Sequence, residues 1–278
     1  MPASQAEPVA EACPLTDTEY AQFRKLIFDI AGISLTDAKK ALVVGRLVKR
    51  LRHFGFTSFG EYFRYITSGS DPAERQMMVD LLTTNETYFF REPKHFDFVR
   101  EIAAQHRRGA FRVWSAASSS GEEAYSVAMV LADTLGDAAW EVVGTDISTR
   151  VLERASRGLY PLERTGGIPP QYLKTYCLKG VGEYAGTLLI TRELREHVQF
   201  RHSNLLSPRT DIGCFDIIFL RNVMIYFDAP TKRKVVANLL PFLKSTGYLI
   251  IGHSESLNGV TTDLALARPT IFQRIGTR

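Results

Sequence analysis

Residues 111–123 have the sequence FRVWSAASSSGEE, and this stretch decides the fold. Its first six residues are mostly apolar, as in a strand that is buried on both faces of a sheet. Small residues follow at 117–121, and the glutamates at 122–123 open a helical pattern that runs to Leu131. A buried strand, a tight loop and a helix make the first unit of a parallel α/β sheet.

The same alternation continues toward the C-terminus. A helix that opens at Pro93 precedes the first strand. Further strands are predicted at 141–145, 198–200, 215–220, 248–251 and 270–273, with helices at 148–157 and 231–243. Strands that are apolar almost throughout and alternate with helices predict a doubly wound, mostly parallel sheet over residues 93–278.

One stretch interrupts this alternation. Residues 179–186 are rich in glycine and lie between short apolar runs at 176–178 and 187–191. The pattern predicts an inserted antiparallel β hairpin, a subdomain at about residues 176–192. Its glycines are too widely spaced for a phosphate-binding loop.

The N-terminal part of the chain has helical signals only. Thr16 with Glu19 and Ser58 with Glu61 have the spacing of capping boxes, and Pro72 follows Asp71 at a third helix start. We expect a loose tail at 1–15, a small helical domain at 16–83 and a linker at 84–92.

The second predicted helix, at about residues 38–53, carries a basic stripe. Its members are Lys39, Arg46, Lys49, Arg50 and His53, and no acidic residue occurs between positions 38 and 60. Such a stripe is either a solvated face or a docking surface for an acidic partner.

Composition excludes several classes of protein. The 278 residues are 45% hydrophobic and 23% charged, which argues against disordered, coiled-coil and collagen-like chains. Cys13, Cys177 and Cys214 form no C-x-x-C pair, so neither a disulfide framework nor a cysteine zinc site is expected. No secretory start and no apolar run of about 20 residues is present, and we expect a cytoplasmic protein.

Polar residues follow each buried strand of the predicted sheet. They are Ser118–Glu123, Asp146, Asn204, Arg221 with Asn222, and His253–Glu255. The carboxyl ends of parallel strands form the ligand site of such folds, and an acid near the position of Asp146 commonly binds ribose. We therefore expect a nucleoside-containing ligand.

The loop after the first strand argues against a phosphate. It lacks the G-x-G-x-x-G pattern, and the carboxylates of Glu122 and Glu123 would repel a pyrophosphate. S-adenosylmethionine has an adenosine, a sulfonium and an amine but no phosphate, so it suits this loop better than a nicotinamide dinucleotide.

Four motifs resemble the CheR family, the chemotaxis receptor methyltransferases. They lie at 84–92 (TNETYFFRE), 114–125, 221–228 (RNVMIYFD) and 252–256 (GHSES), in the family's order. Ala124 and Ser118–Ser120 depart from the usual residues of the family. The resemblance implies a class I methyltransferase-like fold, and transfer of a methyl group from S-adenosylmethionine to receptor glutamates, giving methyl esters and S-adenosylhomocysteine.

The resemblance also implies roles for individual residues. Those expected against the cofactor are Asn85, Thr87, Arg91, Glu123, Asp146, Asn204, Leu205, Arg221 and Asn222, with Arg91 and Tyr226 nearest the transferred methyl. The basic stripe would face the methylation helices of the receptor, and the hairpin can hold a peptide from the receptor's C-terminal end. We expect a monomer that binds no metal or nucleic acid and does not insert into a membrane.

A glutamate carboxylate is already ionised at neutral pH, so its methylation needs no general base. We expect Arg91 and Tyr226 to orient this carboxylate by hydrogen bonds. Structural interpretations stay open: an ion pair for Arg91, core packing for Tyr226, a turn for Asn222 and a strand cap for His253.

Three other functions remain open from the sequence. Residues 252–256 nearly match the G-x-S-x-G elbow of α/β hydrolases, with Ser254 as the nucleophile. A docking adaptor without catalysis would keep the pocket residues. An RNA methyltransferase would use the basic stripe, although that stripe lacks interleaved aromatic residues for base stacking. The receptors, their glutamates and any regulatory partner are not predicted.

Overall fold

The computed structural model describes residues 14–208 and 210–275, which form two compact units. Of the described residues, the first unit contains 14–30 and 34–82, and the second contains 31–33, 83–208 and 210–275. Most of the predicted tail, with Cys13, lies outside the described residues, whereas Leu15 is buried. None of the described helices is both long and apolar enough to cross a membrane.

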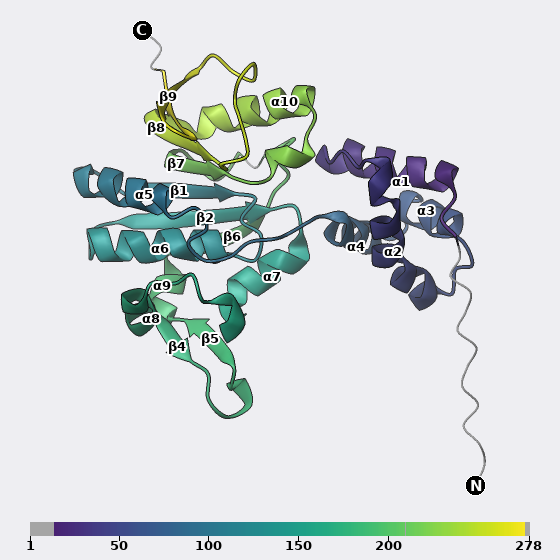
Figure 1. Cartoon of the computed structure of the whole chain (residues 1–278), viewed down its shortest axis with the longest axis horizontal. Helices are drawn as coiled ribbons and strands as arrows, with labels where there is room; N and C mark the ends of the chain where they lie inside the picture. Colours follow the sequence, from purple (N-terminus) through teal and green to yellow (C-terminus); the bar gives the residue numbers. More distant parts are fainter. Residues whose placement is uncertain (1–13, 209, 276–278) are drawn as a thin grey trace. The chain divides into compact units, whose positions relative to one another are not determined.

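The first unit is helical (Figure 1). Its helices are α1 (Asp17–Ala31), α2 (Lys40–Phe54), α3 (Phe59–Thr67) and α4 (Pro72–Leu82), with a 3₁₀ turn η1 (Asp37–Lys39) before α2. The predicted caps are confirmed. The backbone N–H of Glu19 donates to the hydroxyl of Thr16, that of Glu61 to Ser58, and that of Glu74 to the carboxylate of Asp71.

An acid from another helix corrects the prediction that nothing neutralises the basic stripe. Glu74 of α4 is buried, and its carboxylate accepts hydrogen bonds from Nε of Arg50 and from the hydroxyl of Tyr62, both at 2.8 Å. Arg46 donates to the carbonyl of Leu82 at 3.1 Å. Arg50 therefore holds α2 against α4 and is not a free member of the stripe.

The second unit is built on a seven-stranded sheet, in the order β6-β2-β1-β7-β8-β10-β9. The strands are β1 (Phe111–Ala116), β2 (Trp140–Asp146), β6 (Val198–His202), β7 (Phe215–Leu220), β8 (Leu243–Ile251), β9 (Leu264–Arg268) and β10 (Ile271–Arg274). Strands β6 to β8 of this order pair in parallel, and β10 is antiparallel to both neighbours. The predicted doubly wound, mostly parallel sheet is confirmed.

Alternate residues of the strands supply two apolar cores, one on each face of the sheet. Val113, Ile217 and Phe219 belong to the core that contains residues of α5 (Lys94–Gln105) and α6 (Glu122–Leu135). Trp114 and Ile218 point the other way, into the core with α10 (Ala229–Leu239). Figure 1 shows α5 and α6 along one face and α10 along the other. The helix α7 (Thr149–Arg157) contacts β2 and β6.

The predicted hairpin is part of a three-stranded antiparallel sheet. It contains β4 (Cys177–Lys179) and β5 (Thr187–Ile190), and it gains β3 (Leu159–Pro161) from before the predicted insert. Its neighbours are α8 (Pro170–Tyr176) and α9 (Arg192–Glu196), with short 3₁₀ turns η2 (Leu162–Arg164) and η3 (Gly182–Tyr184). The subdomain packs against the main sheet through buried side chains that belong to the core on the α6 face, among them Tyr172, Leu188 and Leu194.

Candidate functional site

The strand order reverses between β1 and β7, so the carboxyl ends of these strands form the expected binding edge. The loop after β1 has an open backbone, since Ala117, Ser119 and Gly121 have φ angles of 84°, 49° and 93°. A Cβ on Gly121 would lie 2.9 Å from Ala155 and 3.0 Å from Phe200. Only glycine therefore allows this loop to turn tightly into α6.

Asp146 ends β2 beside this loop and is buried. Its carboxylate accepts the backbone N–H groups of Ser119 and Ser148, each at 2.9 Å. These bonds hold the carboxylate of Asp146 at the end of β2, beside the loop that follows β1. The nearby hydroxyl of Ser118 is buried and forms no hydrogen bond with any described residue.

The two glutamates at the start of α6 have different surroundings. Glu122 is buried, and its carboxylate contacts Arg164 at 2.9 Å and Ser120 at 2.7 Å. Glu123 accepts from the hydroxyl of Ser115 in β1 at 2.6 Å and from Arg221 after β7 at 3.0 Å. Burial raises the pKa of both carboxyls, and the positive charge of Arg221 opposes this rise at Glu123. Glu123 is therefore the acid that joins β1 to β7 at the switch point.

Arg221 is a buried cation at the centre of this edge. Its guanidinium contacts Glu123, donates to the backbone carbonyl of Arg91, and lies 3.1 Å from the carboxylate of Glu92. Its Nε is buried and forms no hydrogen bond within the described residues. Asn222 follows with a φ of 56°, a strained backbone angle. Such angles occur both in tight turns and at functional sites, so the angle does not separate these two interpretations of Asn222.

The linker residues lie against the same edge through their backbone groups. The carbonyl of Asn85 accepts the hydroxyl of Ser119 at 3.0 Å, and the carbonyl of Thr87 accepts from Arg164 at 3.2 Å. The side chain of Arg91 donates to the carbonyl of Glu86 at 3.2 Å and lies 5.5 Å from the ring centre of Tyr88. The linker backbone thus lies at the strand ends. The Arg91 guanidinium contacts other linker residues, Glu86 and Tyr88.

Two predicted groups lie at other strand ends. Tyr226 is in the 3₁₀ turn η4 (Met224–Tyr226) after β7, where its ring packs partly against the α10 core. Its hydroxyl makes no hydrogen bond to the residues that the structure describes. After β6, the side chain of Asn204 accepts the N–H of Leu206 at 2.9 Å, and the carbonyl of Leu205 accepts from Asn238. Among the described residues, the side chains of Arg91 and Tyr226 form no hydrogen bond with each other.

Two carboxylates that organise this edge, Glu92 and Glu255, were not among the predicted cofactor-binding or catalytic residues, although Glu255 was among the polar residues expected at the strand ends. Glu255 accepts three backbone N–H groups, those of Asn222, Met224 and Gly252, each at 2.8 Å. Glu92 has a φ of 60° and contacts Arg221. Both glutamates lie in motifs quoted above: Glu92 ends the linker motif, and Glu255 follows a buried strand. These positions could have indicated from the sequence that both carboxylates lie at the site.

Two further features bear on the alternatives. Residues after Ser254 form turns and the strand β9, which replaces the helix that a hydrolase nucleophile elbow requires. A cavity of about 370 Å³ lies beside η4, lined by Ile225, Lys232 and Arg233 among others. Its lining includes Glu255 but not Glu123, Asp146 or Tyr226, so this cavity is not the predicted cofactor site.

The polar groups at these strand ends fit S-adenosylmethionine. Carboxylates of Glu123 and Asp146 stand at adjacent strand ends and can accept from an amine or from ribose hydroxyls. The unpartnered hydroxyl of Ser118 and the open loop leave polar groups for a ligand. The edge has no glycine-rich cradle for a pyrophosphate.

Comparison with known families agrees with this geometry. Residues 85–272 match the family model described as "CheR methyltransferase, SAM binding domain". Residues 18–83 match the model described as "CheR methyltransferase, all-alpha domain".

Curated proteins of similar sequence cover nearly the whole chain. The chain is 42% identical to a chemotaxis protein methyltransferase of Escherichia coli K12 over 95% of its length and 93% of that protein. It is 42% identical to one of Salmonella typhimurium LT2 over 93% of its length and 90% of that protein. It is 41% identical to chemotaxis protein methyltransferase 2 of Pseudomonas aeruginosa, over 92% of its length and 93% of that protein.

Proposed function

The chain belongs to the CheR methyltransferase family, and from this premise we propose that it methylates glutamate side chains of bacterial chemoreceptors. It is a class I, S-adenosylmethionine-dependent methyltransferase of chemotaxis. The proposed products are glutamate methyl esters and S-adenosylhomocysteine, and the proposed role is adaptation to a stimulus. The proposed place of action is the cytoplasm, as a monomer.

We assign the cofactor to the strand-end edge. Glu123 and Asp146 would hold its amine and ribose, Asn204 and Leu205 would lie at the adenine, and the linker residues Asn85 and Thr87 would cover it. Arg221 and Asn222 would complete the pocket. When bound, S-adenosylmethionine supplies a methyl group on a positively charged sulfur, which is a good leaving group.

The acceptor side needs placement and no proton transfer. A glutamate carboxylate is an anion at neutral pH, so Arg91 and Tyr226 would orient it by hydrogen bonds. Good orientation alone can lower the activation free energy by about 7–11 kcal/mol. The observation that carries this proposal is the bond from Arg221 to the carbonyl of Arg91, because it holds the linker backbone at Arg91 beside the strand ends that carry Glu123.

Two surfaces are proposed to bind the receptor. Lys49 and His53 on α2, with Lys39 of the turn η1 before it, are exposed and would face the acidic methylation helices. On the small antiparallel sheet, Val181 is 77% exposed and Tyr184 is 55% exposed, so the β4–β5 loop offers apolar side chains to a receptor peptide.

The test is transfer of tritiated methyl groups to receptor-containing membranes. We expect label that is released as methanol by mild base, since esters hydrolyse where methylated amines do not. Receptors whose candidate glutamates are replaced by alanine should take up no label. Label that resists base, or that stays on the alanine-substituted receptors, would contradict the proposal.

Filter binding of single-stranded RNA and labelling by a fluorophosphonate are the matching controls for the other enzyme classes. We expect no retained RNA at moderate salt and no label on Ser254.

A further inference from the structure

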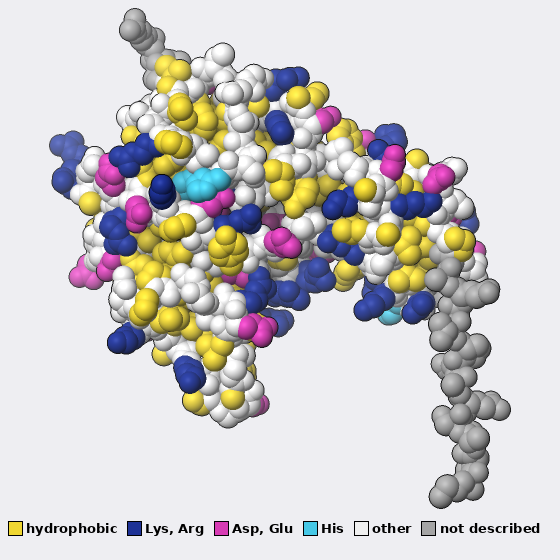
Figure 2. All heavy atoms as spheres, viewed as in Figure 1, with side chains coloured by type: hydrophobic (Ala, Val, Ile, Leu, Met, Phe, Trp, Pro, Cys, Tyr) yellow, Lys and Arg dark blue, Asp and Glu magenta, His cyan; other side chains and the backbone are white. Residues whose placement is uncertain are grey.

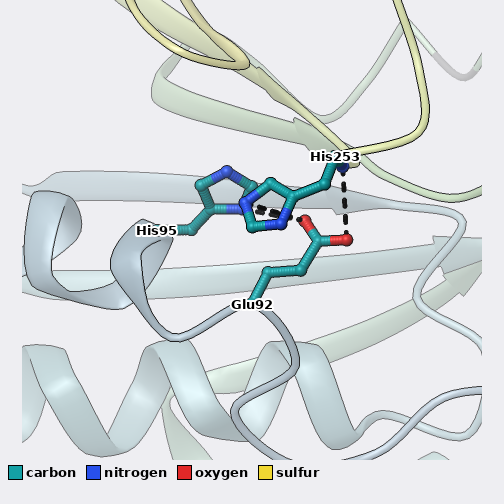
Figure 3. Close-up of side chains that lie close together, drawn as sticks. All are labelled: Glu92, His95 and His253. Atoms are coloured by element: carbon teal, nitrogen blue, oxygen red, sulfur yellow. Dashed lines mark hydrogen bonds and ion pairs between the residues drawn. The ribbon is translucent and has the colours of Figure 1, made fainter.

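A cluster of one carboxylate and two imidazoles stands beside the proposed cofactor edge (Figure 3). Glu92 follows the linker, His95 is in the first turn of α5, and His253 follows β8. Oε2 of Glu92 lies 3.4 Å from Nδ1 of His95 and 3.8 Å from Nε2 of His253. One potential ligand atom from each residue lies within 4.8 Å of the other two. Figure 3 shows the carboxylate pointing toward both rings.

The tautomer of His95 follows from its other ring nitrogen. Nε2 lies 2.8 Å from the hydroxyl of Thr270, and that hydroxyl donates to the carbonyl of Pro269 at 2.6 Å. The hydroxyl therefore accepts from Nε2, which carries the proton. With the proton on Nε2, the neutral ring presents a lone pair at Nδ1.

Two acceptors consequently face each other without a hydrogen between them. His95 is 1% exposed, and neither its Nδ1 nor Oε2 of Glu92 forms a hydrogen bond within the part of the chain that the structure describes. Arg221 lies 3.1 Å from the same carboxylate oxygen but does not reach the imidazole. Among the described residues, Nδ1 has no hydrogen-bond donor and Oε2 has the ion pair with Arg221, so a cation between the two atoms would satisfy the imidazole and share the carboxylate.

We propose that Glu92, His95 and His253 bind a divalent transition-metal ion of the zinc type. Two imidazoles and one carboxylate are ligands that zinc uses in sites with an open fourth position. Tetrahedral bonds of about 2.0–2.2 Å place ligand atoms roughly 3.3–3.6 Å apart, close to the 3.4 Å and 3.8 Å found here. The bond from His95 to Thr270 is the kind of outer hydrogen bond that orients a ligating imidazole.

The site is open to an ion from solvent. The side chain of His253 is 54% exposed, whereas Glu92 and His95 are largely covered. Figure 2 shows histidine side chains at the surface of the second unit, beside acidic and basic neighbours. The positive charge of Arg221 opposes a cation, so we expect weaker binding than in a four-ligand structural zinc site.

A bound ion would join three segments of the second unit. Glu92 already accepts the backbone N–H of His253 at 3.3 Å, and the metal would add bonds from the same carboxylate to α5 and to the residue after β8. Arg221 would keep its contact with Glu123 at 3.0 Å. The ion would thus stabilise the linker end against the sheet without replacing a cofactor residue.

The test is titration of the chelator-treated full chain with Zn²⁺ by calorimetry and with Co²⁺ by visible absorption. We expect one ion per chain, a tetrahedral Co²⁺ spectrum and no thiolate charge-transfer band. His253→Ala should weaken binding by at least about tenfold, the range seen even for outer-shell partners. His202→Ala, which removes another exposed imidazole, should bind like the wild type.

Thermal unfolding supplies a second measurement. At one Zn²⁺ concentration, the Tm should rise for the wild type and for His202→Ala, and rise clearly less for His253→Ala. His253→Gln serves if the alanine variant does not fold. Absence of a bound ion, a thiolate band, or equal affinities for the wild type and the His253 variants would overturn the proposal. Neither measurement uses cofactor or receptor, so the outcome does not depend on methyl transfer.

Discussion

At the scale of single residues, the carboxylates at the strand ends are held in place by Arg221 and by backbone N–H groups. Arg221 is shared by Glu92 and Glu123, and it also holds the carbonyl of Arg91. Asp146 is fixed by two backbone N–H groups. Rigid carboxylates of this kind suit a cofactor with amine and hydroxyl donors, because little reorganisation is needed on binding.

Tyr226→Phe tests the proposed orienting role of the hydroxyl. A hydrogen bond to a charged group contributes about 1.5–3 kcal/mol, so kcat should fall by about 10- to 100-fold. The affinity for S-adenosylhomocysteine, measured by calorimetry, should change less than threefold. Tyr248→Phe is the matched control, since Tyr248 is also partly buried and its ring packs on Phe98. An unchanged kcat in Tyr226→Phe would remove the hydroxyl from the mechanism.

The cysteines provide a test of burial in the small antiparallel sheet. Burial raises the pKa of Cys177 to about 12, whereas Cys214 is exposed. Because the thiolate is the reactive form, iodoacetamide at pH 8 should alkylate Cys214 at least about tenfold faster than Cys177. Peptide mapping by mass spectrometry gives both rates. Equal rates would mean that β4 is not packed as described.

The site could be predicted from sequence only as far as strand ends could be placed. Asp146, Arg221 and Asn222 each follow an apolar run directly, so their convergence at one edge follows from a parallel sheet. The role of Glu255 could not be predicted, because its three backbone donors come from two separate loops. The strained backbone angles of Glu92 and Asn222 could likewise not be predicted, because neither residue is a glycine.

At the scale of elements, the buried strands were the easiest to predict. β1 and β7 have the predicted bounds, because both are apolar nearly throughout and end at turn residues. β9 was not predicted, and the reason is its exposure: after Leu264 its residues face solvent at the sheet edge. β3 was missed because three residues carry too little pattern to separate a strand from a turn.

The helical unit depends on a pairing that no local pattern reveals. Arg50 and Glu74 are 24 positions apart, and together with Tyr62 they form a buried network. Glu74→Ala would leave Arg50 and Tyr62 without their shared acceptor, and we expect a loss of about 3 kcal/mol in the free energy of unfolding. Denaturant unfolding measures the loss.

Lys49→Ala is the control for this prediction. Lys49 is exposed on the same helix, and its removal should change the free energy of unfolding by less than about 0.5 kcal/mol. If Glu74→Ala were as stable as Lys49→Ala, the network would have no structural role, and Arg50 would return to the stripe as a docking residue.

At the scale of the whole molecule, we propose a different function for each of the two units. The second unit would hold the cofactor, and the exposed part of the basic stripe on the first would attract the receptor. Attraction between surface charges acts over about 10 Å at 0.1 M salt. Receptor methylation should therefore weaken as salt rises, while binding of S-adenosylhomocysteine should not.

Replacing Lys39, Lys49 and His53 together by alanine tests the docking surface. We expect receptor methylation at low salt to fall by about tenfold and its dependence on salt to flatten, with unchanged affinity for S-adenosylhomocysteine. Replacement of Lys25 and Lys234 by alanine, two exposed lysines outside the stripe, is the control. A triple variant that methylates receptors like the wild type would show that the stripe is only a solvated face.

The most direct measurement is a crystal structure of the chain with S-adenosylhomocysteine. We predict the product at the carboxyl ends of β1 and β2, with its ribose or amine hydrogen-bonded to the carboxylates of Asp146 and Glu123 and its sulfur toward Arg91 and Tyr226. Electron density for the product at another place, or crystals in which this edge binds a dinucleotide and not the thioether, would contradict the account.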